Sequence, residues 1–107
     1  MDVVERGGIY LVSLDPTVGS EIKKTRPCVV VSPPEIHDYL KTVLVVPLTS
    51  GSRPAPFRVA VRFQEKEGLL LPEQMRAVDK VCLVRHLGNL DGGTADKLFA
   101  VLREMFA

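Results

Sequence analysis

The run RPCVVVS, residues Arg26–Ser32, most constrains what this chain can fold into. Its consecutive valines are β-branched, which favours a strand, and the run is apolar enough to be buried. Pro27 fixes the backbone at the start of the run, and Pro33-Pro34 ends it because proline cannot continue a hydrogen-bonded ladder. The run therefore predicts a short, buried strand with a rigid entrance.

Similar short segments, separated by turn residues, follow one another along the chain. In PFRVAVRF the apolar residues alternate with polar ones, so Arg58 and Arg62 face away from the apolar side. The further segments that these patterns assign to strands are Gly8–Asp15, Lys41–Ser50, Pro56–Phe63, Gly68–Lys80 and the run VCLVRHL at 81–87.

The last segment, Thr94–Phe106, has helical spacing instead, and Asp91 or Thr94 is suited to cap its start. Its apolar stripe, typical of a helix packed on a core, consists of Leu98, Phe99, Leu102, Met105 and Phe106. Short strands followed by one helix predict a mainly β (α+β) fold. We expect a small, strongly bent sheet or barrel with a C-terminal helix, in a single domain over residues 1–107.

Charge, hydropathy and cysteine content indicate where this protein acts and which features it lacks. The formal net charge is +1, so global charge points to no particular partner. No apolar run approaches the roughly 18 residues of a membrane span, and the start MDVVERGG does not resemble a signal peptide, so we expect a cytoplasmic protein. Cys28 and Cys82 lie in apolar surroundings and are expected to be buried free thiols.

The common catalytic signatures are missing, including phosphate-binding loops, nucleophile elbows and clusters of metal ligands. We therefore expect no metal and no cofactor. The two histidines, His37 and His86, are interpreted as incidental surface or boundary residues rather than as catalysts.

Three stretches contain polar residues suited to anion binding, and each has a plainer explanation. Arg26 is aimed by Pro27 and can clamp a phosphate, but it can also form a surface ion pair with Glu21. Thr49 and Ser50 follow an apolar strand, where hydroxyls either donate to phosphate or cap a turn. The segment PEQMRAVD, residues 72–79, either joins this site or is a solvated sheet edge.

The order of these stretches resembles the MazF/PemK (Kid-like) toxin family. RGGIYLVSLDPTVGSEIKKTRPCVVVSP, TVLVVPLTS and EQMRAVDK follow the expected order and spacing, from Arg6 to about Leu102. The resemblance implies an SH3-like barrel with a C-terminal helix, shared with the gyrase poison CcdB. It also implies a homodimer that cuts single-stranded RNA at short specific sequences without a metal. Attack by the 2′-hydroxyl then leaves a 2′,3′-cyclic phosphate and a 5′-hydroxyl end, and translation is inhibited.

The resemblance also implies roles for individual residues. It assigns Arg26 and Thr49 to stabilising the charge that develops on the phosphate, and it leaves Glu21 and Glu73 as competing proton acceptors. The segment Ser50–Phe57 is a candidate for setting the cleavage sequence. The remaining residues expected to contact RNA are Gly19, Ser20, Lys23, Lys24, Thr25, Ser50, Gln74 and Arg76.

Family members are held inactive by an antitoxin whose acidic, disordered tail covers the RNA groove, so we expect such a partner here. The apolar stripe near Leu102, Met105 and Phe106 is a candidate contact for the antitoxin or for the second protomer. Two alternatives stay open: a CcdB-like poison that binds a protein such as gyrase, and a degenerate member that only binds RNA or antitoxin. The absence of tryptophan is evidence against the first, since CcdB acts through a tryptophan-containing C-terminal tip.

Overall fold

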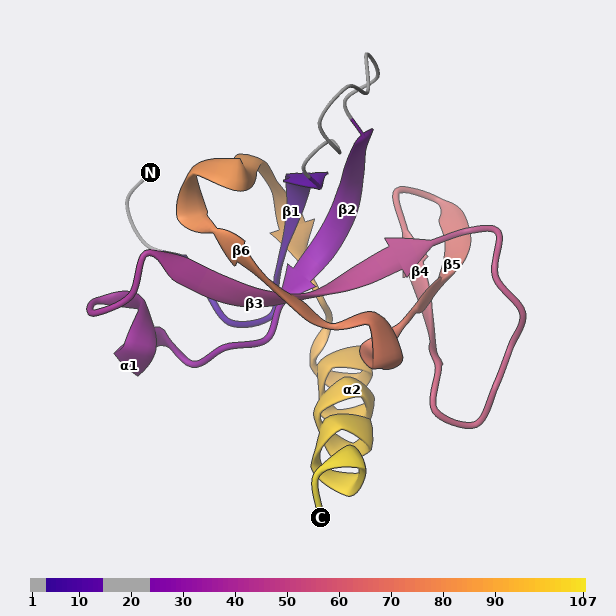
Figure 1. The fold of residues 1–107 in the computed structure, drawn as a ribbon. Helices are drawn as coiled ribbons and strands as arrows, with labels where there is room; N and C mark the ends of the chain where they lie inside the picture. Colours follow the sequence, from indigo (N-terminus) through magenta and orange to yellow (C-terminus); the bar gives the residue numbers. More distant parts are fainter. Residues whose placement is uncertain (1–3, 15–23) are drawn as a thin grey trace.

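The computed structural model describes residues 4–14 and 24–107, except for the side chain of Lys24, and shows a curled antiparallel sheet with a C-terminal helix (Figure 1). The strands are β1 (Gly8–Leu14), β2 (Lys24–Val30), β3 (Thr42–Thr49), β4 (Val59–Phe63), β5 (Lys66–Leu70), β6 (Arg76–Asp79) and β7 (Leu83–Asn89). The α-helices are α1 (Pro34–His37) and α2 (Gly92–Met105), and the 3₁₀ turns are η1 (Pro72–Gln74) and η2 (Lys80–Cys82). The expected fold class is confirmed.

Several expected strand boundaries differ from the structure; the run 81–87, for example, begins in the turn η2 and becomes a strand only at Leu83. The segment Gly68–Lys80 is not one strand but the end of β5, the turn η1 and the strand β6, because Pro72 has no N–H for a ladder and begins the turn. The segment expected from Pro56 becomes a strand only at Val59. Among the described residues, no helix is long and apolar enough to cross a membrane.

Strand β3 organises the sheet. Its first half pairs with β6 from Thr42 to Val45, and its last two residues pair with β5. Its other edge pairs with β2, where Cys28 lies across from Pro47. The resulting order is β4-β5-β3-β2-β1-β7, with β6 beside β3. Because β5 and β6 share one edge of β3, the sheet curls into a half-barrel.

The sheet is buried on both faces. Along β2, Cys28 and Val30 belong to one core, while Val29 and the following Val31 belong to the other. The barrel core contains Val4, Tyr10, Val12, Cys28, Val30, Val43, Val45, Val78 and Leu83. The helix-side core contains Ile9, Val29, Val31, Val46, Val59, Val61, Leu70, Leu98 and Leu102. This two-sided burial explains why the valine run has no polar alternation.

Helix α2 begins two residues earlier than expected and is capped by Asp91. Asp91 Oδ1 accepts a 2.7 Å hydrogen bond from the Thr94 backbone N–H, and that bond is the main reason that the pKa of the Asp91 carboxyl is lowered. The apolar stripe is only partly core, because Leu98 and Leu102 are buried whereas Phe106 is 70% exposed. The end of the helix therefore presents apolar surface to the outside.

His37 is not a surface or boundary residue, as the sequence suggested, but is buried. Its Nδ1 lies 3.2 Å from the Val4 carbonyl oxygen, which can only accept, so Nδ1 donates. Its Nε2 then accepts from the Ser32 hydroxyl at 2.7 Å, and Ser32 Oγ accepts from the Leu44 N–H at 3.1 Å. The chain of bonds joins the N-terminal segment to β3 through helix α1.

We expect His37→Phe to lower the free energy of unfolding by about 2 kcal/mol, because it leaves the buried Val4 carbonyl and Ser32 hydroxyl without partners. Urea denaturation measures this effect. The control is His86→Phe, since His86 is exposed and stacks on Tyr10 at 4.6 Å between ring centroids. The control should shift stability by less than about 0.5 kcal/mol. An equal loss of unfolding free energy in the two variants would contradict the buried hydrogen-bonding role of His37.

Candidate functional site

Two arginines lie at one end of the barrel core. Arg26 is two residues before Cys28 on β2, and Arg76 is two residues before Val78 on β6, so both side chains are on the barrel-core face. Burial raises the pKa of the Cys28 thiol to about 12, and the charges of Arg26 and Arg76 oppose that rise. Both guanidinium groups are therefore close enough to act on one buried atom.

Thr49 ends β3 on the same face as Val45 and Pro47. Since Cys28 pairs with Pro47, continuing the register by two residues places Arg26 across from Thr49. Thr49 Oγ1 accepts a 3.4 Å hydrogen bond from the Gly51 N–H, so the hydroxyl caps the turn, as the plainer explanation required. An accepting hydroxyl keeps its own hydrogen, which remains able to donate.

Gly68 allows β5 to approach Thr49. A Cβ atom at Gly68 would lie 2.9 Å from the Thr49 carbonyl oxygen and 3.3 Å from Leu48 Cδ2. No side chain fits at that separation without moving the backbone, so the position of Thr49 depends on this glycine.

The turn η1 is attached to β3 beside the same site. The Leu71 N–H donates to the Pro47 carbonyl at 3.0 Å, and the Gln74 N–H donates to the Leu71 carbonyl at 2.9 Å. Gln74 and Ser50 are both exposed, as contact with a ligand requires.

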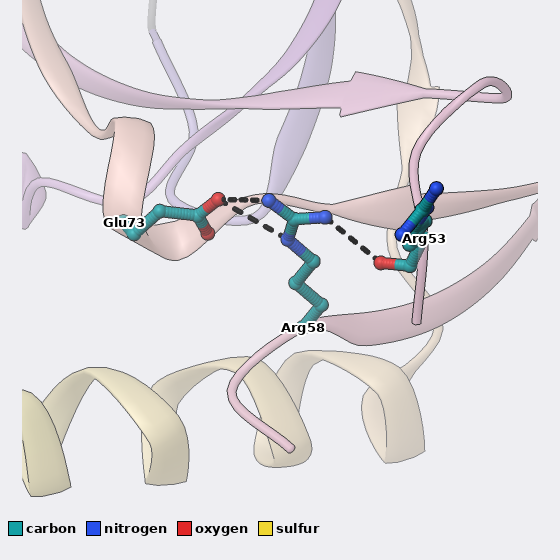
Figure 2. Close-up of polar contacts among 3 residues, drawn as sticks. All are labelled: Arg53, Arg58 and Glu73. Carbon is teal, nitrogen blue, oxygen red and sulfur yellow. Dashed lines mark hydrogen bonds and ion pairs between the residues drawn. The ribbon is translucent and has the colours of Figure 1, made fainter. Parts of the chain in front are cut away.

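Glu73 forms an ion pair that the sequence analysis missed (Figure 2). Its Oε2 accepts from Arg58 Nη2 at 2.7 Å and from Arg58 Nε at 3.1 Å. The third donor of Arg58, Nη1, lies 2.8 Å from the backbone carbonyl oxygen of Arg53. The alternating pattern placed Arg58 on the polar side of its segment, but no spacing signal connects residues 58 and 73.

Several predicted site residues lie outside the described residues: Gly19, Ser20, Glu21 and Lys23. The proposed pairing of Arg26 with Glu21 lies outside them as well. Lys24 is the first residue of β2, and Thr25 beside it is exposed. Within residues 4–14 and 24–107, no group of three or more His, Cys, Asp or Glu side chains could hold a metal ion.

The described site therefore combines two cations and a hydroxyl on one face, at the point where β2 and β3 leave the barrel core. Strands that are buried on both faces hold Arg26 and Thr49, so these donors have little freedom to move. A guanidinium and a hydroxyl so arranged can bind the oxygens of a tetrahedral anion such as phosphate.

A family model described as "PemK-like, MazF-like toxin of type II toxin-antitoxin system" matches residues 5–106. Over 76 residues, the chain is 37% identical to the Endoribonuclease toxin MazF of Escherichia coli K12, covering 71% of this chain and 68% of that protein. It is 29% identical over 107 residues to Endoribonuclease EndoA of Bacillus subtilis, covering 94% and 92%.

Solved structures agree in fold. A MazE–MazF crystal structure from Deinococcus radiodurans contains a chain that superposes with a TM-score of 0.83 at 21% identity, covering 97% of this chain and 96% of that one. A mycobacterial endoribonuclease in complex with its cognate antitoxin gives 0.78 at 21% identity, covering 99% and 95%. At these identities the likeness shows a shared fold.

We expect Gly68→Ala to destabilise the protein by about 1–3 kcal/mol, because the added methyl group collides with the Thr49 backbone. Amide chemical shifts of Thr49 and Leu48 should move in the same variant. The control is Gly51→Ala, since a Cβ atom at Gly51 has nothing within 4 Å. A Gly68→Ala protein as stable as the control would refute the close approach.

Cys28 should make stability fall at high pH. The folded state keeps the thiol protonated up to a pKa of about 12, whereas the unfolded thiol titrates near 8.5. The contribution of this thiol is thus fully present below about pH 8.5 and is lost as the pH rises toward 12. Urea unfolding at several pH values should give a steeper decline for the wild type than for Cys28→Ala. Parallel curves would contradict this assignment.

Proposed function

The chain belongs to the family of PemK-like, MazF-like toxins of type II toxin–antitoxin systems, and from this premise we propose that it is an endoribonuclease. It cuts single-stranded RNA at short specific sequences, in the cytoplasm and without a metal ion, and so inhibits translation. The observation that supports this proposal is that Arg26 on β2 and Thr49 on β3 each lie two residues beyond the Cys28–Pro47 pair, so the register directs both to the barrel-core face on neighbouring strands.

The reaction needs donors where charge develops. The 2′-hydroxyl attacks the adjacent phosphorus, the 2′-oxygen–phosphorus bond forms and the bond to the 5′-oxygen breaks. A base takes the 2′ proton, and the 5′-oxygen leaves with a proton as a 5′-hydroxyl, while the other product ends in a 2′,3′-cyclic phosphate. Negative charge builds on the non-bridging oxygens during the attack. Arg26 and the Thr49 hydroxyl donate to these oxygens, and the loss of one such donor raises the barrier by about 3–4 kcal/mol.

The proton acceptor is one of two carboxylates. Glu73 Oε2 already accepts two hydrogen bonds from Arg58, so the carboxylate is held toward Arg58 and only Oε1 has no recorded partner among the described residues. That geometry favours Glu21, which lies outside the described residues. Either carboxylate has to be placed within hydrogen-bond distance of the 2′-hydroxyl to act.

The RNA runs along the face that carries Arg26. Arg76 adds a second cation on the same face of the sheet, and the exposed Gln74 and Ser50 are available to contact bases. The other residues that we assign to RNA contact are Gly19, Ser20, Lys23, Lys24 and Thr25. Phosphate contacts of this kind supply affinity that weakens as the salt concentration rises.

Two protein partners complete the proposal. The toxin forms a homodimer, and an antitoxin with an acidic, disordered tail competes with RNA for the basic face. The exposed apolar end of α2, with Met105 41% and Phe106 70% exposed, supports a protein contact there. Solved relatives of the same fold include toxins crystallised with an antitoxin.

Arg26→Ala should lower the rate of RNA cleavage by about 10²–10³-fold, because the developing charge loses a fixed donor. The assay uses a long single-stranded RNA in EDTA, with both product ends mapped. The wild type should leave a cyclic phosphate and a 5′-hydroxyl.

The control is Arg85→Ala. Arg85 is exposed and pairs with Leu11, which lies across from Pro27, so its side chain is on the other face of the sheet from Arg26. The Arg85→Ala variant should cleave RNA at the wild-type rate. A pure wild-type protein that cuts no RNA would reject the proposal and favour a CcdB-like poison that binds a protein target.

A further inference from the structure

We propose that Arg58 is a positioning residue of the cleavage site, which holds the segment 50–57 against the turn η1, and that Glu73 is its anchor. This inference rests on the proposed function, because it concerns how the same site holds RNA. Arg58 touches neither Arg26 nor Thr49 in any recorded contact, so its influence is exerted through the backbone.

The contacts of Arg58 bridge two parts of the chain. Toward one side, Nε and Nη2 bind Glu73 Oε2, and toward the other, Nη1 binds the Arg53 carbonyl (Figure 2). The Arg58 backbone N–H also donates to the Ala55 carbonyl at 3.0 Å. The side chains of Arg58 and Glu73 are only 20% and 29% exposed, so this pair is partly shielded from water and salt.

Each of the two parts carries residues of the site. The segment 50–57 begins directly after Thr49 and contains the Gly51 N–H that binds the Thr49 hydroxyl. Glu73 lies in η1, which Leu71 fastens to Pro47 and which leads through Gln74 into Arg76. Arg58 therefore closes a loop that starts and ends at β3.

Closing this loop reduces its freedom before RNA arrives. Pro54 and Pro56 already restrict the backbone, and the bond to the Arg53 carbonyl fixes the path of the chain between them and Gly51. A segment that is ordered in advance loses less entropy when it binds a ligand. We call the bonds from Arg58 to Glu73 and to the Arg53 carbonyl the clamp. Loss of the clamp should weaken RNA binding and make the cleavage sequence less specific, with little effect on the chemical step.

Arginine is needed because the two acceptors lie on different sides of the group. A guanidinium has donors that point along fixed, diverging directions in one plane, whereas the ammonium of lysine is a single point charge. Arg58→Lys can keep the ion pair with Glu73 but not the simultaneous bond to Arg53. Comparing Arg58→Lys with Arg58→Gln therefore separates the effect of the positive charge from the effect of the simultaneous bonds to Glu73 and Arg53.

The test measures kcat and KM for RNA cleavage, cleavage sites on a mixed-sequence RNA, and hydrogen exchange of the segment 50–57. We expect Arg58→Gln to raise KM about tenfold, to broaden the cleavage preference and to leave kcat within about twofold. Glu73→Gln should raise KM and broaden the preference to the same extent. The double variant should be no worse than either single one, since both remove the same clamp. Arg58→Lys should fall between the wild type and Arg58→Gln.

The matched control is Arg62→Gln, an exposed arginine on β4. It should keep the wild-type KM and cleavage preference, and exchange in 50–57 should increase only in the clamp variants. Two results would overturn the inference. The first is unchanged exchange in Arg58→Gln. The second is a large fall in kcat for Glu73→Gln alone, with a changed acid limb of its pH profile, which would make Glu73 the proton acceptor.

Failure of the proposed function gives a different result. If the wild type cuts no RNA, the enzymatic proposal fails and a role in cleavage fails with it. Hydrogen exchange still decides whether Arg58 orders the segment 50–57 in that case. If the wild type cuts RNA and the Arg58 variants match it in KM and preference, only the positioning role is rejected.

Discussion

Strand β3 is hydrogen-bonded to three other strands, and the rest of the structure depends on this shared pairing. Its first half bonds to β6, its end bonds to β5, and its opposite edge bonds to β2. The pairing with β6 ends at Val45 and the pairing with β5 begins at Leu48, so two strands follow one another along one edge of β3, and the sheet curls (Figure 1). The curl encloses the barrel core on one side and leaves the other side to helix α2.

The site follows from where that pairing stops. Arg26 and Thr49 are on the barrel-core face but just beyond the apolar residues that fill it, so rigid strands deliver polar groups to the surface. The same arrangement keeps Cys28 protonated beneath two guanidinium groups. The two candidate donors thus obtain their fixed positions from the burial of their neighbours two residues away along each strand.

Most of the fold could be predicted from local signals, because β-branched runs, prolines and the helical stripe each act over a few residues. The valine run of β2 and the burial of Cys28 were expected and are confirmed, and of the two candidate caps the structure has Asp91. Cys82, which was also expected to be buried, is only partly buried. The errors have a different origin. The burial of His37 depends on partners at Val4 and Ser32, and the Arg58–Glu73 pair joins residues 15 positions apart in the chain. No periodicity encodes such contacts, since they arise only when the sheet curls.

The bond between Arg58 and residue 53 has an evolutionary consequence. It is made to the main-chain carbonyl oxygen of Arg53, which every amino acid possesses. Side chains in the segment 50–57 can therefore be exchanged during divergence, or in a library of variants, while the anchor is retained. Under the proposed function, in which the segment 50–57 contributes to the choice of cleavage sequence, a toxin built in this way acquires a new target by changes in one short segment and keeps its fold.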